Sequence, residues 1–302
     1  MRRFLLLALA ALALVAAGCG GDGGGGGDGG GGAQEANEVL QRGFSTDVDS
    51  GEISVEMELQ LEGLEGADGS FRLELSGPFR SRGPTKLPDA DLDFSASGQG
   101  VNLQGGLVLL PENAWIEFGD ETYEVGEELW KRAQGTLNSD GGPETFGEAK
   151  VKPLAWIEGA ETAEGEQISG TETTKVTGRL DIAAMLGDFD RLSGDSTAMP
   201  RETLDQIDEA IGPVEFEAWI GDDDIWRRVS SKTNFTVPEG QRPGVGGLSG
   251  GRVSLDMTLD TPNEDVSIES PGAGRPISEL LRALGVPPEA LLGPGFEVPE
   301  PG

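Results

Sequence analysis

Residues 52–62, EISVEMELQLE, alternate apolar and polar side chains without a break. Successive side chains of a strand point to opposite faces, so this period of two predicts an antiparallel strand with one dry face and one wet face. The dry face would carry Ile53, Val55, Met57, Leu59 and Leu61. Such a strand is stable only beside others of its kind, so the segment constrains the chain to build a sheet with one covered face.

The same alternation returns along the chain, separated by turn residues as a meandering sheet requires. We expect further strands at 69–77, 90–96, 101–110, 115–118, 168–182, 214–220, 226–237, 251–260 and 264–270. Helical spacing predicts helices at 36–43, 126–134, 153–160, 182–192 and 200–212, and Asp181 is the expected N-cap of the fourth.

Strands, then helices, then strands again indicate an α+β domain in which helices gather on one face of a single curved antiparallel sheet. We place this domain at 36–270, a length suited to one unit. The tail, 271–302, is rich in Pro and Gly and holds one amphipathic segment with Ile277, Leu280, Leu281 and Leu284. That apolar stripe must cover something, so we expect it to cap the sheet or the mouth of a cavity.

The chain starts with the features of an export signal. Arg2 and Arg3 precede the uncharged run 4–17, which falls inside the range of about 7 to 15 residues of a signal's apolar region. A membrane-spanning helix needs about 20 residues, so a permanent span is the poorer interpretation. We expect residues 1–18 to be a signal peptide that is removed.

The run ends in VAAGC, which resembles the bacterial lipobox, although Ala16 stands where Leu is more usual. The chain holds 1 Cys, Cys19, so no disulfide can form within it. We expect Cys19 to become a diacylglyceryl cysteine, which supplies the two chains that stable anchoring needs; the alternative is an incidental cysteine behind an ordinary signal. Residues 19–35, mostly Gly, would then form a flexible linker to the outer face of the cell membrane.

Composition excludes several classes of function. The net charge of −32 opposes nucleic-acid binding, which needs a basic surface. The chain has no His, which removes triad catalysis and histidine metal sites together. We therefore expect no enzyme activity, no catalytic residues, no cofactor and no metal. Asp222, Asp223 and Asp224 offer carboxylates for Ca²⁺ but lack ligands at EF-hand spacing, so a hairpin tip is the favoured interpretation.

Several motifs occur in an order that resembles a known family. They are ELQLEG, RLELSG, AWIEFGDETYEV, ETTKVTGRLDIAAML, VEFEAWIGDDDIWRRV and DMTLDTPNEDVSIESP, which follow the signal with Cys19. Together they resemble the LppX/LprG group of actinobacterial lipoproteins across 36–270. The acidity of the chain, the stretches 135–147 and 238–251, and the tail depart from that group.

The resemblance implies a LolA-like fold, in which a strongly bent antiparallel half-barrel wraps around helices and encloses an apolar cavity. It also implies that a lipid or glycolipid is carried in the cell envelope. The expected partners are the membrane, through the lipid anchor, and a hydrophobic ligand; protein partners are not predicted.

A lipid cavity needs inward-facing apolar side chains that leave space between them. The candidates for its lining are Ile53, Val55, Met57, Leu59, Phe71, Leu73, Leu75, Phe94, Val253, Leu255, Met257 and Leu259. The alternative is that these side chains simply pack against the helices, because alternation reports which face is dry and not whether it is filled. The two hypotheses for function are thus a tethered lipid carrier and a surface lipoprotein that uses the same sheet as a scaffold for protein interaction.

Overall fold

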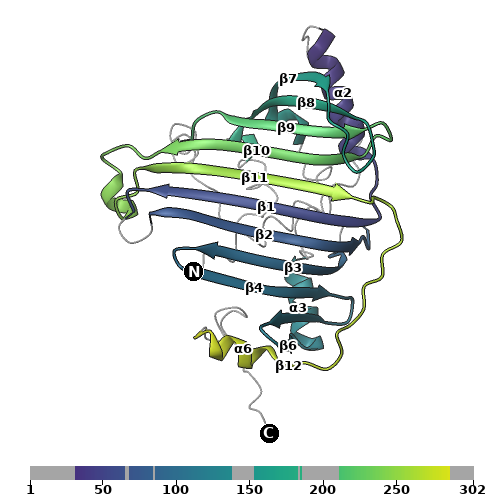
Figure 1. The fold of residues 1–302 in the computed structure, drawn as a ribbon, viewed down its shortest axis with the longest axis vertical. Coiled ribbons are helices and arrows are strands. Elements are labelled where there is room, and N and C mark those ends of the chain that lie inside the picture. The colour runs from purple at the N-terminus through teal and green to yellow at the C-terminus, as the bar shows by residue number, and fades with distance from the viewer. Residues whose placement is uncertain are drawn as a thin grey trace.

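The computed structural model describes residues 31–64, 68–83, 86–137, 153–182, 184–185 and 211–285, and these form one sheet of 12 strands (Figure 1). The strand order is β12-β6-β5-β4-β3-β2-β1-β11-β10-β9-β8-β7. Every neighbouring pair is antiparallel except β12 and β6, which are parallel. The sheet does not close on itself, because β7 and β12 lie at its two ends. The predicted α+β fold with one curved sheet is confirmed.

The strands are β1 (Ser50–Glu62), β2 (Gly69–Arg80), β3 (Asp89–Gly98), β4 (Val101–Leu109), β5 (Ala114–Phe118), β6 (Glu121–Glu124), β7 (Ile157–Glu164), β8 (Thr173–Leu180), β9 (Val214–Gly221), β10 (Trp226–Thr236), β11 (Gly250–Asp260) and β12 (Arg275–Pro276). The described helices are α2 (Gly31–Ser45), α3 (Glu127–Leu137) and α6 (Ile277–Ala283), with short 3₁₀ turns η1 (Pro153–Trp156) and η2 (Arg242–Val245). None of the described helices is long and apolar enough to cross a membrane.

All the described helices pack on the same face of the sheet, which we call the inner face. Trp130 of α3 packs with Ile53 and Val55 of β1, and its indole Nε1 donates a hydrogen bond to the carbonyl oxygen of Leu110 at 2.7 Å. Leu40 of α2 packs in a second cluster with side chains of β7, β8 and β9. None of the described helices covers the other face, as the alternating strands predicted; Val266 and Ile268 pack on it over β4 and β5.

The helix α2 confirms the spacing of Ala36, Val39 and Leu40, all of which are buried. It continues past Gly43 to Ser45. Gly43 is instead a contact point with the sheet, since a Cβ built there would lie 2.4 Å from Cδ1 of Ile220. The residue lets the helix approach β9 closely.

Three phenylalanines on the inner face each lie against a glycine of the neighbouring strand. The directly opposite pairs are Phe71 with Gly98, Phe94 with Gly105, and Phe235 with Gly251. A Cβ built on these glycines would approach the phenyl carbons to 2.6, 2.6 and 2.8 Å, respectively. Glycine allows a sheet to bend, and a ring laid over it restores the lost packing. Each glycine therefore makes room for the ring of the facing phenylalanine, and we expect these positions to help the sheet curve.

Two predicted elements are wrong. Residues 153–160 do not form a helix: η1 ends at Trp156, and β7 follows at the edge of the sheet. Pairing with β8 overrides the local preference, and the left-handed Gly159, with φ of 61°, lies in a register shift. Residues 264–270 do not form a strand either; Val266 and Ile268 pack against Val108, Leu110 and Trp115.

The predicted helices 182–192 and 200–212 lie almost wholly outside the described residues, as do Cys19 and the signal. The start of the first of these helices is described. Asp181 accepts a hydrogen bond at Oδ1 from the backbone N–H of Ala184 at 2.8 Å, which confirms its N-cap role.

Candidate functional site

The predicted lining residues all lie on the inner face of four adjacent strands. Residues 52–61 of β1 each stand opposite partners on both β11 and β2. Val55, for example, lies between Met257 and Leu75, and Leu75 in turn faces Phe94 of β3. Directly opposite residues share a face of the sheet. The rows that follow are Met57 with Leu255 and Leu73, then Leu59 with Val253 and Phe71.

Burial divides these residues into two groups. Ile53, Val55 and Leu259 belong to the core under α3, and Leu259 is 0% exposed. The others are only half-buried: Met57, Leu59, Phe71, Leu73, Leu75, Phe94, Val253, Leu255 and Met257. Three of them, Leu75, Leu255 and Met257, also pack against the edge of that core. We call this second group the apolar face.

The apolar face extends onto two strands that the predicted lining omitted. On β10, Val229 stands opposite Met257, and Phe235 stands opposite Gly251. On β4, Val101 and Leu103 continue the rows of Phe71 and Leu73 by way of Gly98 and Ala96. Between Val229 and Phe235 the same face of β10 carries Ser231 and Thr233. The sequence 226–236 therefore has the period of a strand but few apolar residues on its inner face.

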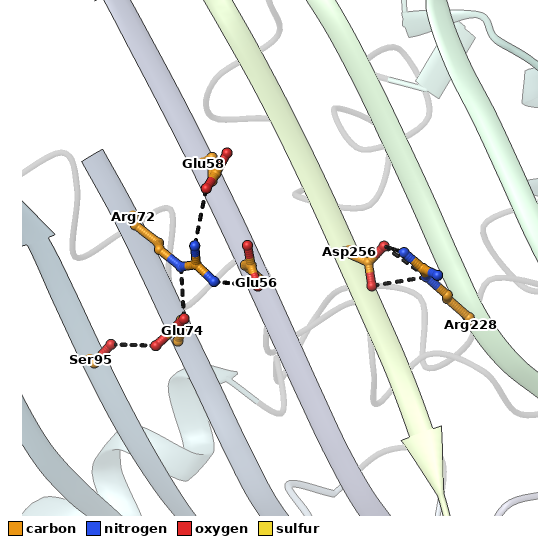
Figure 2. Close-up of polar contacts among 7 residues, drawn as sticks. All are labelled: Glu56, Glu58, Arg72, Glu74, Ser95, Arg228 and Asp256. Atoms are coloured by element: carbon orange, nitrogen blue, oxygen red, sulfur yellow. Dashed lines mark hydrogen bonds and ion pairs between the residues drawn. The ribbon is translucent and has the colours of Figure 1, made fainter. Parts of the chain in front are cut away.

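The outer face of the same strands is polar. Arg72 of β2 forms ion pairs with Glu56 at 2.8 Å, Glu58 at 3.3 Å and Glu74 at 2.7 Å, and Ser95 Oγ donates a hydrogen bond to Glu74 at 2.9 Å (Figure 2). The hydrogen bonds from Ser95 and Arg72 lower the pKa of the Glu74 carboxyl, and the bond to Glu74 raises the pKa of Arg72. Arg72 thus ties β2 to β1 on the solvent side, and Glu74 ties β2 to β3 through Ser95.

A second outer-face cluster joins β8 to β11. Arg228 pairs with Asp256 at 2.7 Å (Figure 2). It also pairs with Glu166 at 3.2 Å. The ring centroid of Trp219 lies 4.8 Å from Lys175 Nζ and 4.9 Å from Arg228 Cζ, so the buried indole is covered by two cations. These contacts account for Trp219 as a structural residue of the outer face.

The aspartates 222–224 lie at the β9–β10 turn, as favoured from the sequence. Asp223 pairs with the buried Arg227, and Asp224 pairs with Arg42 of α2 at 2.9 Å. Among the described residues, no three His, Cys, Asp or Glu side chains are grouped so that they could hold a metal ion. The carboxylates of this turn hold the hairpin and α2 together.

The tail segment closes the β6 end of the sheet. Ile277, Leu280 and Leu281 of α6 are buried in a cluster with Tyr123, while Leu284 is 51% exposed. Partly buried Ile116, Phe118 and Leu129 pack against this cluster. Phe118 stands opposite Gly105, next in the row to Phe94, so α6 borders the apolar face at its β5 end.

A separate hollow lies at the other end of the sheet, between α2 and β7. It is lined by Gly32, Ala33, Gly159, Ala160, Glu161 and Thr162 and is open to solvent. None of the residues of the apolar face lines it. The apolar character of the molecule is therefore concentrated elsewhere, and this hollow does not serve as the candidate site.

No protein-family model and no curated protein sequence matches the chain. Among solved structures, the chain is similar to the lipoprotein LppX of Mycobacterium tuberculosis, with 13% identity, 78% of this chain and 99% of that chain covered, and a TM-score of 0.42. It is also similar to LprF from Mycobacterium bovis, with 15% identity, coverage of 80% and 99%, and a TM-score of 0.41. A DUF1329 family protein from Desulfovibrio piger has 7% identity, coverage of 78% and 95%, and a TM-score of 0.21.

Proposed function

We propose that this protein is a membrane-tethered binding module that holds a lipid or another hydrophobic molecule on the apolar face. The tether would be the acylated Cys19, and the domain would act on the outer face of the cell membrane. The module would bind and carry its ligand without chemistry of its own.

One observation carries this proposal: two half-buried apolar rows cross β11, β1 and β2, and they consist of Leu255, Met57 and Leu73, and of Val253, Leu59 and Phe71. A sheet face that serves only as core is buried along its whole length, as Ile53 and Leu259 are. Half-buried aliphatic and aromatic side chains in contiguous rows are what an acyl chain would cover. Met57 and Met257 add flexible side chains that adapt to irregular ligands.

The proposal predicts that a charge placed on the apolar face abolishes ligand binding. Met57→Lys should lower the affinity for a fluorescent fatty-acid probe at least about tenfold, because the ammonium group would have to be desolvated against the acyl chain. The matched control is Gln60→Lys, which adds the same charge to the exposed outer face of the same strand. The measurement is a probe titration of both variants, with thermal unfolding to show that each is folded.

The scaffold hypothesis gives a different result. If the sheet is a solid scaffold for a protein partner, the unsubstituted chain does not bind the probe, and the two lysine variants behave alike in the titration. That outcome would reject the carrier function.

A further inference from the structure

The β3–β4 hairpin carries the apolar face out into solvent. Val101 is 48% exposed and Leu103 is 40% exposed. Val101 stands opposite Gly98, which faces Phe71, and Leu103 stands opposite Ala96, which faces Leu73. Both exposed side chains therefore lie at the end of rows that belong to the apolar face.

The tip of this hairpin is a tight turn. Gln99 and Gly100 have φ of 52° and 78°, and the pair joins Gly98 directly to Val101. Positive φ at both central residues is the signature of a type I′ turn, which holds the two strands in fixed register. The aliphatic side chains are thus presented by a rigid tip.

The hairpin also carries no charged side chain. No Asp, Glu, Lys or Arg occurs between Asp93 and Glu112, in a chain whose net charge is −32. On the neighbouring strands, Arg72 and Glu74 of β2 belong to the outer-face cluster, and Glu117 of β5 lies on the outer face beside Gly106. The nearest acid at the tip is Asp68, just before β2, whose backbone oxygen accepts a hydrogen bond from the side chain of Gln99. This segment can leave water without desolvating a charge, whereas an acidic segment cannot.

We propose, given the binding function above, that the β3–β4 hairpin contacts the lipid bilayer, with Val101 and Leu103 inserted at its surface. The apolar face would then open directly onto the acyl chains, so that a lipid could pass between bilayer and protein without crossing water. The hairpin would complement the anchor at Cys19: the anchor keeps the domain close, and the hairpin orients it.

The linker between Cys19 and α2 is long enough to allow this orientation. The stretch from Cys19 to Gly31, where α2 starts, reaches at most about 40 Å when extended. The strands β1 to β4 have 9 to 13 residues, which corresponds to about 30–43 Å. A lipid anchor moves freely in the plane of the bilayer. The linker therefore has to span only the height of the start of α2 above the bilayer surface, and its extended length is sufficient for that.

A second copy of the chain fits the hairpin less well. A stable protein interface buries about 800 Å² per partner, far more than two aliphatic side chains offer. Two copies at a net charge of −32 each would also repel one another. A bilayer needs no matching surface and tolerates a small apolar tip.

The test uses residues 19–302, joined through Cys19, the single cysteine, to a maleimide phospholipid in phosphatidylcholine vesicles. Hydrogen exchange of residues 98–104 is followed with and without vesicles. We expect exchange there to slow about threefold or more on the vesicles, because inserted amides open to water less often. The double variant Val101→Glu, Leu103→Glu should lose this protection, while Leu284→Glu, at the exposed C-cap of α6, should retain it.

Three results would overturn the proposal: no slowing in the unsubstituted chain, equal slowing in the double variant, or slowing that occurs at high protein concentration without vesicles, which would indicate a second copy. These three results do not test the binding function. That function is tested by the fatty-acid titrations of Met57→Lys and Gln60→Lys, which use the untethered chain in solution. A hairpin that stays in water therefore leaves those titrations unchanged.

Discussion

Replacing Trp130 with Ala is expected to lower the free energy of unfolding by about 3–5 kcal/mol. The indole is 6% exposed and lies in the core cluster with Ile53, Val55 and Leu259. Its loss leaves a cavity under α3 and also removes the donor that pairs with the carbonyl oxygen of Leu110. Both effects act on the element that closes the buried end of the inner face, and urea unfolding measures their sum.

The matched variant is Trp130→Phe, which keeps most of the ring and removes the hydrogen bond. It should cost less, about 1–2 kcal/mol, which is the range for one lost bond and a small loss of packing. A Trp130→Ala variant that unfolds within about 1 kcal/mol of the unsubstituted protein would show that α3 does not close this end of the sheet.

Replacing Gly105 with Ala should destabilise the protein by about 3 kcal/mol, although the change adds a single methyl group. The new Cβ would lie 2.3 Å from the backbone oxygen of Glu117 and 2.6 Å from Cζ of Phe94. A backbone oxygen cannot move aside as a flexible side chain can. β4 and β5 therefore have to move apart at this point, which is visible as a lower midpoint of urea unfolding.

The neighbouring Gly106 supplies the control. Its Cβ would point to the outer face and meet the side chain of Glu117, with Oε2 at 3.1 Å as the nearest atom. Because that side chain can turn away into solvent, Gly106→Ala should change stability by less than about 1 kcal/mol. Equal effects of the two substitutions would contradict the explanation of the curvature by glycines beneath phenylalanine rings.

The sequence was enough to predict which residues of a strand lie on the inner face, because the side-chain period of a strand is fixed. In 52–62 the alternation decides which residues face inward, and the register with β2 and β11 then brings the predicted lining residues together. A slip of one residue would have turned Val55 and Met57 to solvent. Burial on one face is therefore enough to predict most of the candidate site.

The degree of burial was not predictable in the same way. Ile53 and Met57 occupy equivalent places in the same pattern, yet the first is core and the second is half-buried. The difference arises because α3 covers only one end of the strand, a tertiary contact that alternation does not report. The same limit applies to Val266 and Ile268, whose alternation is real but matches the outer surface of β4 and β5 rather than a sheet position.

The edge strand β7 shows the opposite case, in which local pattern and tertiary pairing disagree. PLAWIEGA has apolar residues at spacings that suit a helix, but Ala160 is buried against α2 from a strand. Strand preference depends strongly on the neighbours that a segment finds. Here the pairing of β7 with β8 decides the structure.

If the apolar face holds a lipid, that lipid should be found in the purified protein, where extraction can detect it. Residues 19–302 carrying Cys19→Ser would be expressed without the signal, extracted with organic solvent and analysed by mass spectrometry beside the Met57→Lys variant. We predict an acyl lipid in an amount close to that of the protein for the first chain, and a large loss of it for the second. A folded protein that yields no lipid and binds no fatty-acid probe would contradict the account.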